Sequence, residues 1–293
     1  MSDIPADPAL PDPDAIRRDI DALDDRLHDL LRERAELAAR LAGSLPPTRG
    51  ARFLRPGREA MTMQRLMSRH DGKLSQATLA RVYREITGGL YHLQAPLHVA
   101  VLAPEKSVGY WDLARNHFGS TVEMSLHRTA PVVLRGITTQ PGTVGVLPLP
   151  PEGDAEPWWD SIAVAAAALG EGLPPRVVAR LPGLADPPGR FEELTSYVIA
   201  TASPEPSGQD LSLVVATMSD QMSRGTLSTK LARAGLEGQI IAVREDGRGS
   251  HLLFEIQGFV AEQDPRLGGA IADCGGALHR LISIGSYACL SQG

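Results

Sequence analysis

Hydrophobic positions recur at helical spacing from residue 16 to residue 43 and predict one long helix. The apolar positions are Ile16, Ile20, Leu23, Leu27, Leu30, Leu31, Leu37 and Leu41. At about 100° per residue, Arg34 falls inside this stripe, within roughly 20° of Leu23 and Leu27. Because one helix has no core of its own, we expect the stripe to be buried in a two-chain bundle.

Two shorter helical patterns follow. The stretch "PGREAMTMQRLMSRH" begins at Pro56, a residue favoured in the first turn of a helix. The stretch "SQATLARVYREITGGLYHLQ" carries apolar residues at helical spacing, and Pro96 closes it. Residues 1–13 are acidic and rich in proline, which predicts a disordered lead-in before the first helix.

The hydrophobic pattern changes at residue 97. Short runs rich in valine and leucine alternate with helical segments up to residue 206, which predicts an α/β unit with mostly buried strands. Its last part is rich in loop residues and contains one clear strand, residues 196–200. Residues 210–291 follow the order β-α-β-β-α-β, which is the ferredoxin-like arrangement. The predicted fold class is therefore multidomain, helical at the N-terminus and α/β after it.

Composition and charge narrow the function classes. The net charge of −6 argues against general nucleic-acid binding, which needs a basic face. The two cysteines provide neither a disulfide framework nor a metal set. The N-terminus does not have the pattern of a signal peptide, and no apolar run is long enough to span a membrane. We therefore expect a cytoplasmic protein.

The arginines of the helical region are the main candidates for chemistry. A buried arginine requires an anion because its guanidinium does not lose its charge. A salt bridge would satisfy Arg34, but further polar residues accompany it in the helical patterns: Arg17, Arg58, Glu59 and Gln94. Several cations, one carboxylate and one amide around a bundle cavity suit a small dianion better than a structural ion pair. Arg17 lies about five turns from Arg34, so an antiparallel partner helix would have to bring them together.

These residues lie in a pattern that resembles the all-helical class of chorismate mutase. The pattern is I-R-x-x-I-D-x-L-D-x-x-L-x-x-L-L-x-E-R-x-x-L-A, then P-x-R-E, then R-E-I and a final Q, and it covers residues 14–95. The resemblance implies an intertwined homodimer that rearranges chorismate to prephenate without a metal or an organic cofactor. It also implies that Arg17 of the partner chain and Arg34 hold the two carboxylates, and that Arg58 fixes the ring end. Glu59 would accept the ring hydroxyl, and Gln94 would donate to the ether oxygen.

Two positions depart from this family. Leu45 stands where the family has a lysine aimed at the ether oxygen, and Leu90 replaces a family serine. Arg49 and Arg52, in the loop after the long helix, are the candidates to replace the lysine.

The rest of the chain resembles bifunctional chorismate mutase–prephenate dehydratase proteins, which continue with a dehydratase domain and an ACT regulatory domain. Residues 97–206 resemble a truncated dehydratase domain whose motifs are not intact. "APEKSVGYW" replaces the Gly-Pro-x-Gly-Thr-Phe-Ser stretch, and Thr195-Ser196-Tyr197 replaces Thr-Arg-Phe. Residues 210–291 resemble an ACT domain, with Gly225-Thr226-Leu227 in place of the effector-binding Gly-Ala-Leu and Val243 to Asp246 where Glu-Ser-Arg-Pro is expected. The resemblance implies an aromatic amino-acid effector; the alternative is an ACT fold kept only for dimerisation.

Three functions stay open from the sequence. The first is a chorismate mutase in phenylalanine and tyrosine biosynthesis that has lost dehydratase activity. The second is a non-catalytic relative that binds an aromatic metabolite or regulates a partner enzyme, which the missing lysine favours. The third is a prephenate-processing enzyme, such as a decarboxylase, built on the middle domain, where no acid or base stands out.

Overall fold

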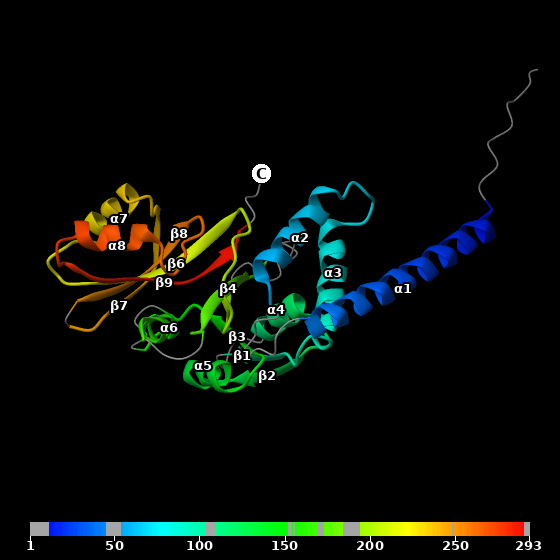
Figure 1. Cartoon of the computed structure of the whole chain (residues 1–293), viewed down its shortest axis with the longest axis horizontal. Coiled ribbons are helices and arrows are strands. Elements are labelled where there is room, and N and C mark those ends of the chain that lie inside the picture. Colours follow the sequence, from blue (N-terminus) through cyan, green and yellow to red (C-terminus); the bar gives the residue numbers. More distant parts are fainter. Residues whose placement is uncertain are drawn as a thin grey trace, which may run out of the picture. The chain divides into compact units, whose positions relative to one another are not determined.

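The computed structural model describes residues 12–44, 54–103, 109–151, 154, 156–168, 173–183, 194–247 and 249–289. The chain divides into two compact units, Met1–Pro46 and Pro47–Gly293, and each is described by itself. Figure 1 shows the elements in chain order. The division falls inside the predicted helical domain, so the predicted boundaries at residues 14–95, 97–206 and 210–291 remain predictions.

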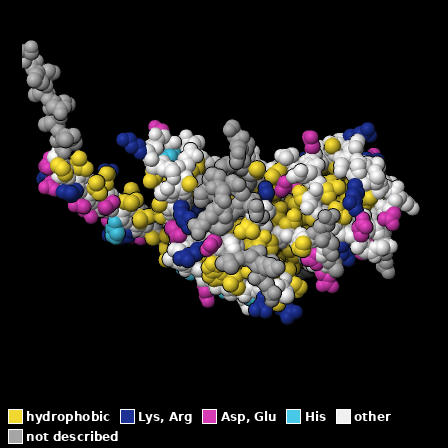
Figure 2. Space-filling view, turned by 180° about the vertical axis from the view of Figure 1, so that it is seen from behind, with side chains coloured by type: hydrophobic (Ala, Val, Ile, Leu, Met, Phe, Trp, Pro, Cys, Tyr) yellow, Lys and Arg dark blue, Asp and Glu magenta, His cyan; other side chains and the backbone are white. Residues whose placement is uncertain are grey.

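The first unit contains the long helix, α1 (Pro13–Ser44), as the hydrophobic pattern predicted. Asp12 starts it: its Oδ1 accepts a hydrogen bond from the backbone nitrogen of Asp14 at 3.1 Å, and its carbonyl oxygen accepts one from Ile16. None of the residues of α1 is buried, and Figure 2 shows hydrophobic side chains exposed along it.

The second unit begins with α2 (Pro56–Ser68) and α3 (Gln76–Tyr91). Ser75 caps α3 by accepting a hydrogen bond from the backbone nitrogen of Thr78. The sequence pattern extended this helix to residue 94, but the helix ends at Tyr91. Its last carbonyl groups are instead used by a tight turn, in which the backbone nitrogen of Gln94 donates to the carbonyl oxygen of Tyr91 at 2.8 Å.

The α/β part follows the helices, and its β-strands and α-helices alternate through most of its length. Its elements are β1 (His98–Leu102), α4 (Gly109–Phe118), β2 (Glu123–His127), α5 (Ala130–Thr139), β3 (Thr143–Pro148), α6 (Trp158–Ala167), β4 (Arg176–Leu181) and β5 (Ser196–Ala200). β1 pairs in parallel with β2 and β3, whereas β5 is antiparallel to both β3 and β4. The expectation of one clear strand in the last part was incomplete. β4 is a second strand there, and it forms because it can pair with both β5 and β9 (Leu278–Ala288).

The C-terminal part contributes four antiparallel strands with two helices between them. Its elements are β6 (Asp210–Met218), α7 (Arg224–Arg233), β7 (Gly238–Glu245), β8 (Ser250–Gln257), α8 (Pro265–Asp273) and β9. Within the described residues, one nine-stranded sheet runs in the order β2-β1-β3-β5-β4-β9-β6-β8-β7. The predicted fold class is thus confirmed at the level of a helical region followed by a large mixed α/β sheet.

The two parts of the sheet meet at a close backbone approach. Val177 of β4 is opposite Gly285 of β9 in the parallel pairing. Gly285 has φ +143°, and a Cβ there would lie 2.1 Å from the carbonyl oxygen of Val177. Only glycine fits this position without displacing the backbone. The hydrophobic core on one face of β1, β3 and β5 includes α4, and the core on the other face includes α5 and α6.

Candidate functional site

The helix α1 presents two of the predicted site residues. Arg34 is exposed, and it lies among apolar residues that are 37% to 59% exposed. Arg17 is also exposed, and its Nη1 forms an ion pair with Oδ1 of Asp14 at 2.6 Å. The rise of an α-helix places Arg17 and Arg34 about 25 Å apart along the axis. One copy of α1 therefore does not bring both guanidinium groups to the same small ligand.

Glu59 lies between α2 and α3, with its side chain 22% exposed. The hydroxyl of Tyr91 donates a hydrogen bond to Oε1 of Glu59 at 2.7 Å. Nη1 of Arg84 lies 3.9 Å from Oε2, so one guanidinium compensates part of the negative charge. Burial raises the pKa of Glu59 above its usual value, and the charge of Arg84 and the hydrogen bond from Tyr91 act in the opposite direction.

Arg58 does not share this environment, although it is adjacent in sequence. It is exposed and lines a groove of about 790 Å³ between α2 and residues 207–209. Arg65 follows Arg58 by seven residues, lies on the same face of α2 and lines the same groove. Ser207 and Gln209 line the opposite side. The structure therefore separates the predicted pair: Arg58 faces the groove, whereas Glu59 faces α3.

Gln94 follows the end of α3, and its side chain is partly exposed. Arg49, Arg52 and Leu45 lie outside the described residues, so the predicted replacement for the family lysine has no structural description. Within the second unit, the structure places Arg58, Glu59 and Gln94 on α2 and just after α3. Arg17 and Arg34 belong to the other unit.

From the sequence alone, no role was predicted for Arg84, which lies in the R-E-I motif, or for Tyr91. Both contact the carboxylate of Glu59, and both are shielded from solvent, Arg84 to 16% exposure and Tyr91 to 5%. The sequence contained a signal for them. Arg84 and Tyr91 are seven residues apart and therefore share a face of α3, and Tyr91 precedes the candidate Gln94 by three residues. The same face also reaches α4. His117 is partly buried there, and its desolvation and the nearby charge of Arg84 hold the pKa of its imidazole well below the usual range.

The predicted effector stretch lies at the start of α7. Ser223 caps this helix by accepting a hydrogen bond from the backbone nitrogen of Thr226 at 3.1 Å. Leu227 is fully buried in the core, whereas a Cβ on Gly225 would meet no atom within 4 Å. This arrangement leaves Gly225 and Thr226 accessible and gives Leu227 a packing role.

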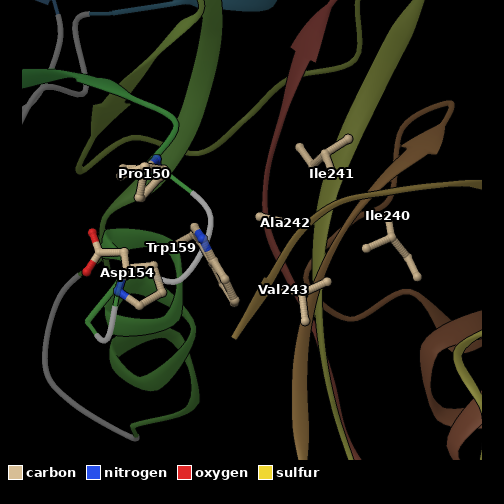
Figure 3. Close-up of a pocket in the computed structure, with 9 residues that line it drawn as sticks. Pro150, Asp154, Trp159, Ile240, Ile241, Ala242 and Val243 are labelled. Carbon is tan, nitrogen blue, oxygen red and sulfur yellow. The ribbon is translucent and has the colours of Figure 1, made fainter. Parts of the chain in front are cut away.

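A cavity of about 250 Å³ lies between residues 150–159 and β7 (Figure 3). Trp159 projects from α6 toward the β7 residues Ala242 and Val243, and prolines line the other side. Asp154 is the one ionisable side chain among the described lining residues. A mostly apolar cavity with a single exposed carboxylate offers no paired acid and base.

Metal ligands do not gather in the described residues, which contain no cluster of three histidine, cysteine, aspartate or glutamate side chains. His98 and His127 are bridged by the hydroxyl of Ser125, at 2.8 and 2.7 Å, and this pair alone is too few for a metal centre. Among the described helices, none combines the length and the hydropathy that crossing a membrane requires.

Comparison with known proteins identifies the helical region. The family model for chorismate mutase type II matches residues 16–95. A bifunctional chorismate mutase/prephenate dehydratase of Stutzerimonas stutzeri is 35% identical over 139 residues, which are 46% of this chain and 38% of that protein. The match thus spans well under half the length of this curated relative.

Two solved structures are similar to part of this chain at low identity. The quorum-quenching acylase GqqA has a TM-score of 0.46 at 13% identity, covering 66% of this chain and 95% of that chain. The prephenate dehydratase of Streptococcus mutans has a TM-score of 0.42 at 13% identity, covering 65% and 97%. Neither likeness bears on activity, because one fold hosts many unrelated functions. The family match rests on the sequence: residues 16–95 of this chain match the family model for chorismate mutase type II.

Proposed function

We propose that this protein is a chorismate mutase that rearranges chorismate to prephenate. The observation that carries the proposal is the family match over residues 16–95, in a segment that retains Arg17, Arg34, Arg58, Glu59 and Gln94. The reaction forms no covalent intermediate. The protein must hold a dianion in its folded conformer and place positive charge beside the breaking ether bond, which is catalysis by preorganisation and electrostatics.

The site is proposed to form between two copies of the chain. The exposed apolar stripe of α1 supports this, because eight large hydrophobic side chains in a row are costly to leave in water. An antiparallel second copy of α1 brings Arg17 of the partner chain toward Arg34. These two guanidinium groups then hold the two carboxylates of the substrate.

The remaining roles follow the resemblance. Arg58 is proposed to bind the ring end of the substrate, for which its exposed side chain turns away from the groove beside residues 207–209, and Gln94 to donate a hydrogen bond to the ether oxygen. Glu59 accepts the ring hydroxyl through a carboxylate whose orientation Tyr91 fixes. Leu45 supplies no second donor to the ether oxygen, so Arg49 or Arg52 is proposed to do so. Losing one such donor typically costs about 100- to 1,000-fold in rate.

The test is the rate of chorismate loss with the full chain, with the product identified as prephenate by chromatography. Arg34→Ala should abolish the acceleration, whereas Arg32→Ala on the opposite face of α1 should leave it unchanged. A folded, dimeric parent protein that consumes chorismate no faster than buffer would contradict the proposal. If turnover is found, Arg49→Ala and Arg52→Ala identify the group that replaces the lysine.

We infer that dehydratase activity is lost. Ser196 stands where the resemblance places an arginine; it is fully buried, and its hydroxyl makes no hydrogen bond with the described residues. Such a side chain offers no cation for a prephenate carboxylate. We also propose that residues 210–291 form an ACT-like module, which the element order and the strand order β9-β6-β8-β7 support. In this module Gly225 and Thr226 are the candidate contacts for an aromatic amino acid.

A second candidate is a non-catalytic relative that binds an aromatic metabolite. Leu45 is the observation that favours it, because an apolar residue there removes a charge that the family uses in the reaction. Binding of chorismate or prephenate without turnover, lost in Arg34→Ala, would support this candidate over the mutase.

A further inference from the structure

Arg176 is a buried cation at the seam where β4 meets β9. Its side chain is 5% exposed, and its Nη1 donates a hydrogen bond to the carbonyl oxygen of Ser283 at 3.0 Å. Nη2 forms an ion pair with Oε1 of Glu262 at 2.5 Å. A guanidinium stays charged when buried and has five N–H donors, so donors beyond these two contacts carry a desolvation cost unless a ligand accepts from them.

A cavity of about 190 Å³ lies beside this guanidinium. Its polar lining includes Arg176, Glu262 and Ser203, and its apolar lining includes Pro174, Ala202 and Val260. For scale, an engineered apolar cavity of about 150 Å³ holds a benzene molecule. The space therefore admits a molecule slightly larger than benzene and excludes most drug-sized ligands.

The charges of the cavity select the ligand class. A simple anion would compete with Glu262 for Nη2 and would be repelled by its carboxylate. A simple cation would leave the donors of Arg176 unused. A molecule with adjacent negative and positive groups can insert into the ion pair, because its carboxylate replaces Glu262 at Nη2 of Arg176 while its ammonium group replaces Nη2 at the Glu262 carboxylate.

We propose that this cavity binds a free α-amino acid with a small aliphatic side chain. The carboxylate binds Arg176, the ammonium group binds Glu262, and the side chain packs against Pro174, Ala202 and Val260. Glu262 is 56% exposed, which gives the ammonium group a position at the entrance. The site is on different elements from Gly225 and Thr226, and it does not depend on the mutase function.

Isothermal titration calorimetry of the full chain tests the ligand class. L-valine and L-leucine are the probes, and 3-methylbutanoate and 3-methylbutylamine are matched compounds that each keep one charge. We expect both amino acids to bind and each single-charge compound to bind at least about ten-fold more weakly, since a hydrogen bond to a charged group is worth about 1.5–3 kcal/mol. No binding heat from either amino acid to folded protein would overturn the proposal.

Three variants test the location. Glu262→Gln removes the charge from an exposed side chain and should weaken valine binding at least about ten-fold, and Arg176→Gln should do the same. Ala202→Leu fills the cavity, leaves both charges in place and should abolish binding. Glu237→Gln, an exposed control outside the cavity lining, should change nothing. Binding that survives Glu262→Gln and Ala202→Leu but is lost in Gly225→Asp would place the amino acid at α7 and overturn the site.

Discussion

The hydroxyl of Tyr91 donates a hydrogen bond to Oε1 of Glu59 at 2.7 Å, and this contact joins α3 to α2 at the proposed substrate site. The other carboxylate oxygen of Glu59, Oε2, lies 3.9 Å from Nη1 of Arg84. A carboxylate held at one oxygen presents the other in a defined direction. Tyr91 is therefore a positioning residue for the group that is proposed to accept the ring hydroxyl.

Tyr91→Phe should shift the acid limb of the mutase pH–rate profile upward. The hydroxyl donates to the charged form of Glu59 and lowers the pKa of that carboxyl; without it, burial raises the pKa further. The measurement is kcat/KM for chorismate against pH, with Tyr83→Phe on the same helix as the matched control. An unchanged acid limb, with lowered activity at every pH, would mean that Tyr91 only packs.

Glu59→Gln should make stability less dependent on pH. Burial raises the folded-state pKa of Glu59, so the folded state favours the protonated carboxyl. Its stabilising contribution is fully present below the unfolded pKa of about 4.5 and is lost as pH rises through the higher folded value. The parent should therefore lose stability relative to Glu59→Gln over this window. Urea unfolding at several pH values checks this, and parallel curves for the two proteins would contradict it.

Gly88→Ala and Gly89→Ala should have opposite effects on stability. A Cβ on Gly88 would lie 2.0 Å from the carbonyl oxygen of Phe118, where α3 contacts α4, whereas a Cβ on Gly89 would meet nothing within 4 Å. We expect Gly88→Ala to destabilise by about 1–3 kcal/mol through overpacking. Gly89→Ala should stabilise by up to about 1 kcal/mol, because alanine favours a helix. Denaturant unfolding gives the change in the free energy of unfolding for each variant. Equal changes would contradict the close approach of α3 to α4 at Gly88.

Leu27→Asp should dissociate the proposed dimer. The substitution adds a carboxylate to the apolar stripe of α1, where a bundle would have to bury it without a partner. Ala22→Asp adds the same charge on a different face of α1 and is the control. Sedimentation velocity gives the mass of each variant. A dimer that persists in Leu27→Asp would place the subunit contact elsewhere in the chain.

The hydrophobic pattern alone determined most elements and the order in which they follow. Helical spacing located α1 and placed Arg34 within its apolar face, because a side chain's direction on a helix depends on local geometry. Pro56 and Ser75 marked the starts of α2 and α3 because they act on backbone groups a few residues away. The resemblance to chorismate mutase over residues 14–95 also required no tertiary structure, because it depends on residue types and their spacing.

Only the tertiary structure decided which side chains meet across elements. Nothing local to residue 59 shows that Tyr91 and Arg84 contact its carboxylate, or that Arg58 faces a groove with residues 207–209. β4 was missed because its pairing partners β5 and β9 lie far along the chain, and Arg176 becomes a buried cation only where those strands meet. Local propensity acts within a few residues, whereas burial and charge pairing depend on segments that folding brings together.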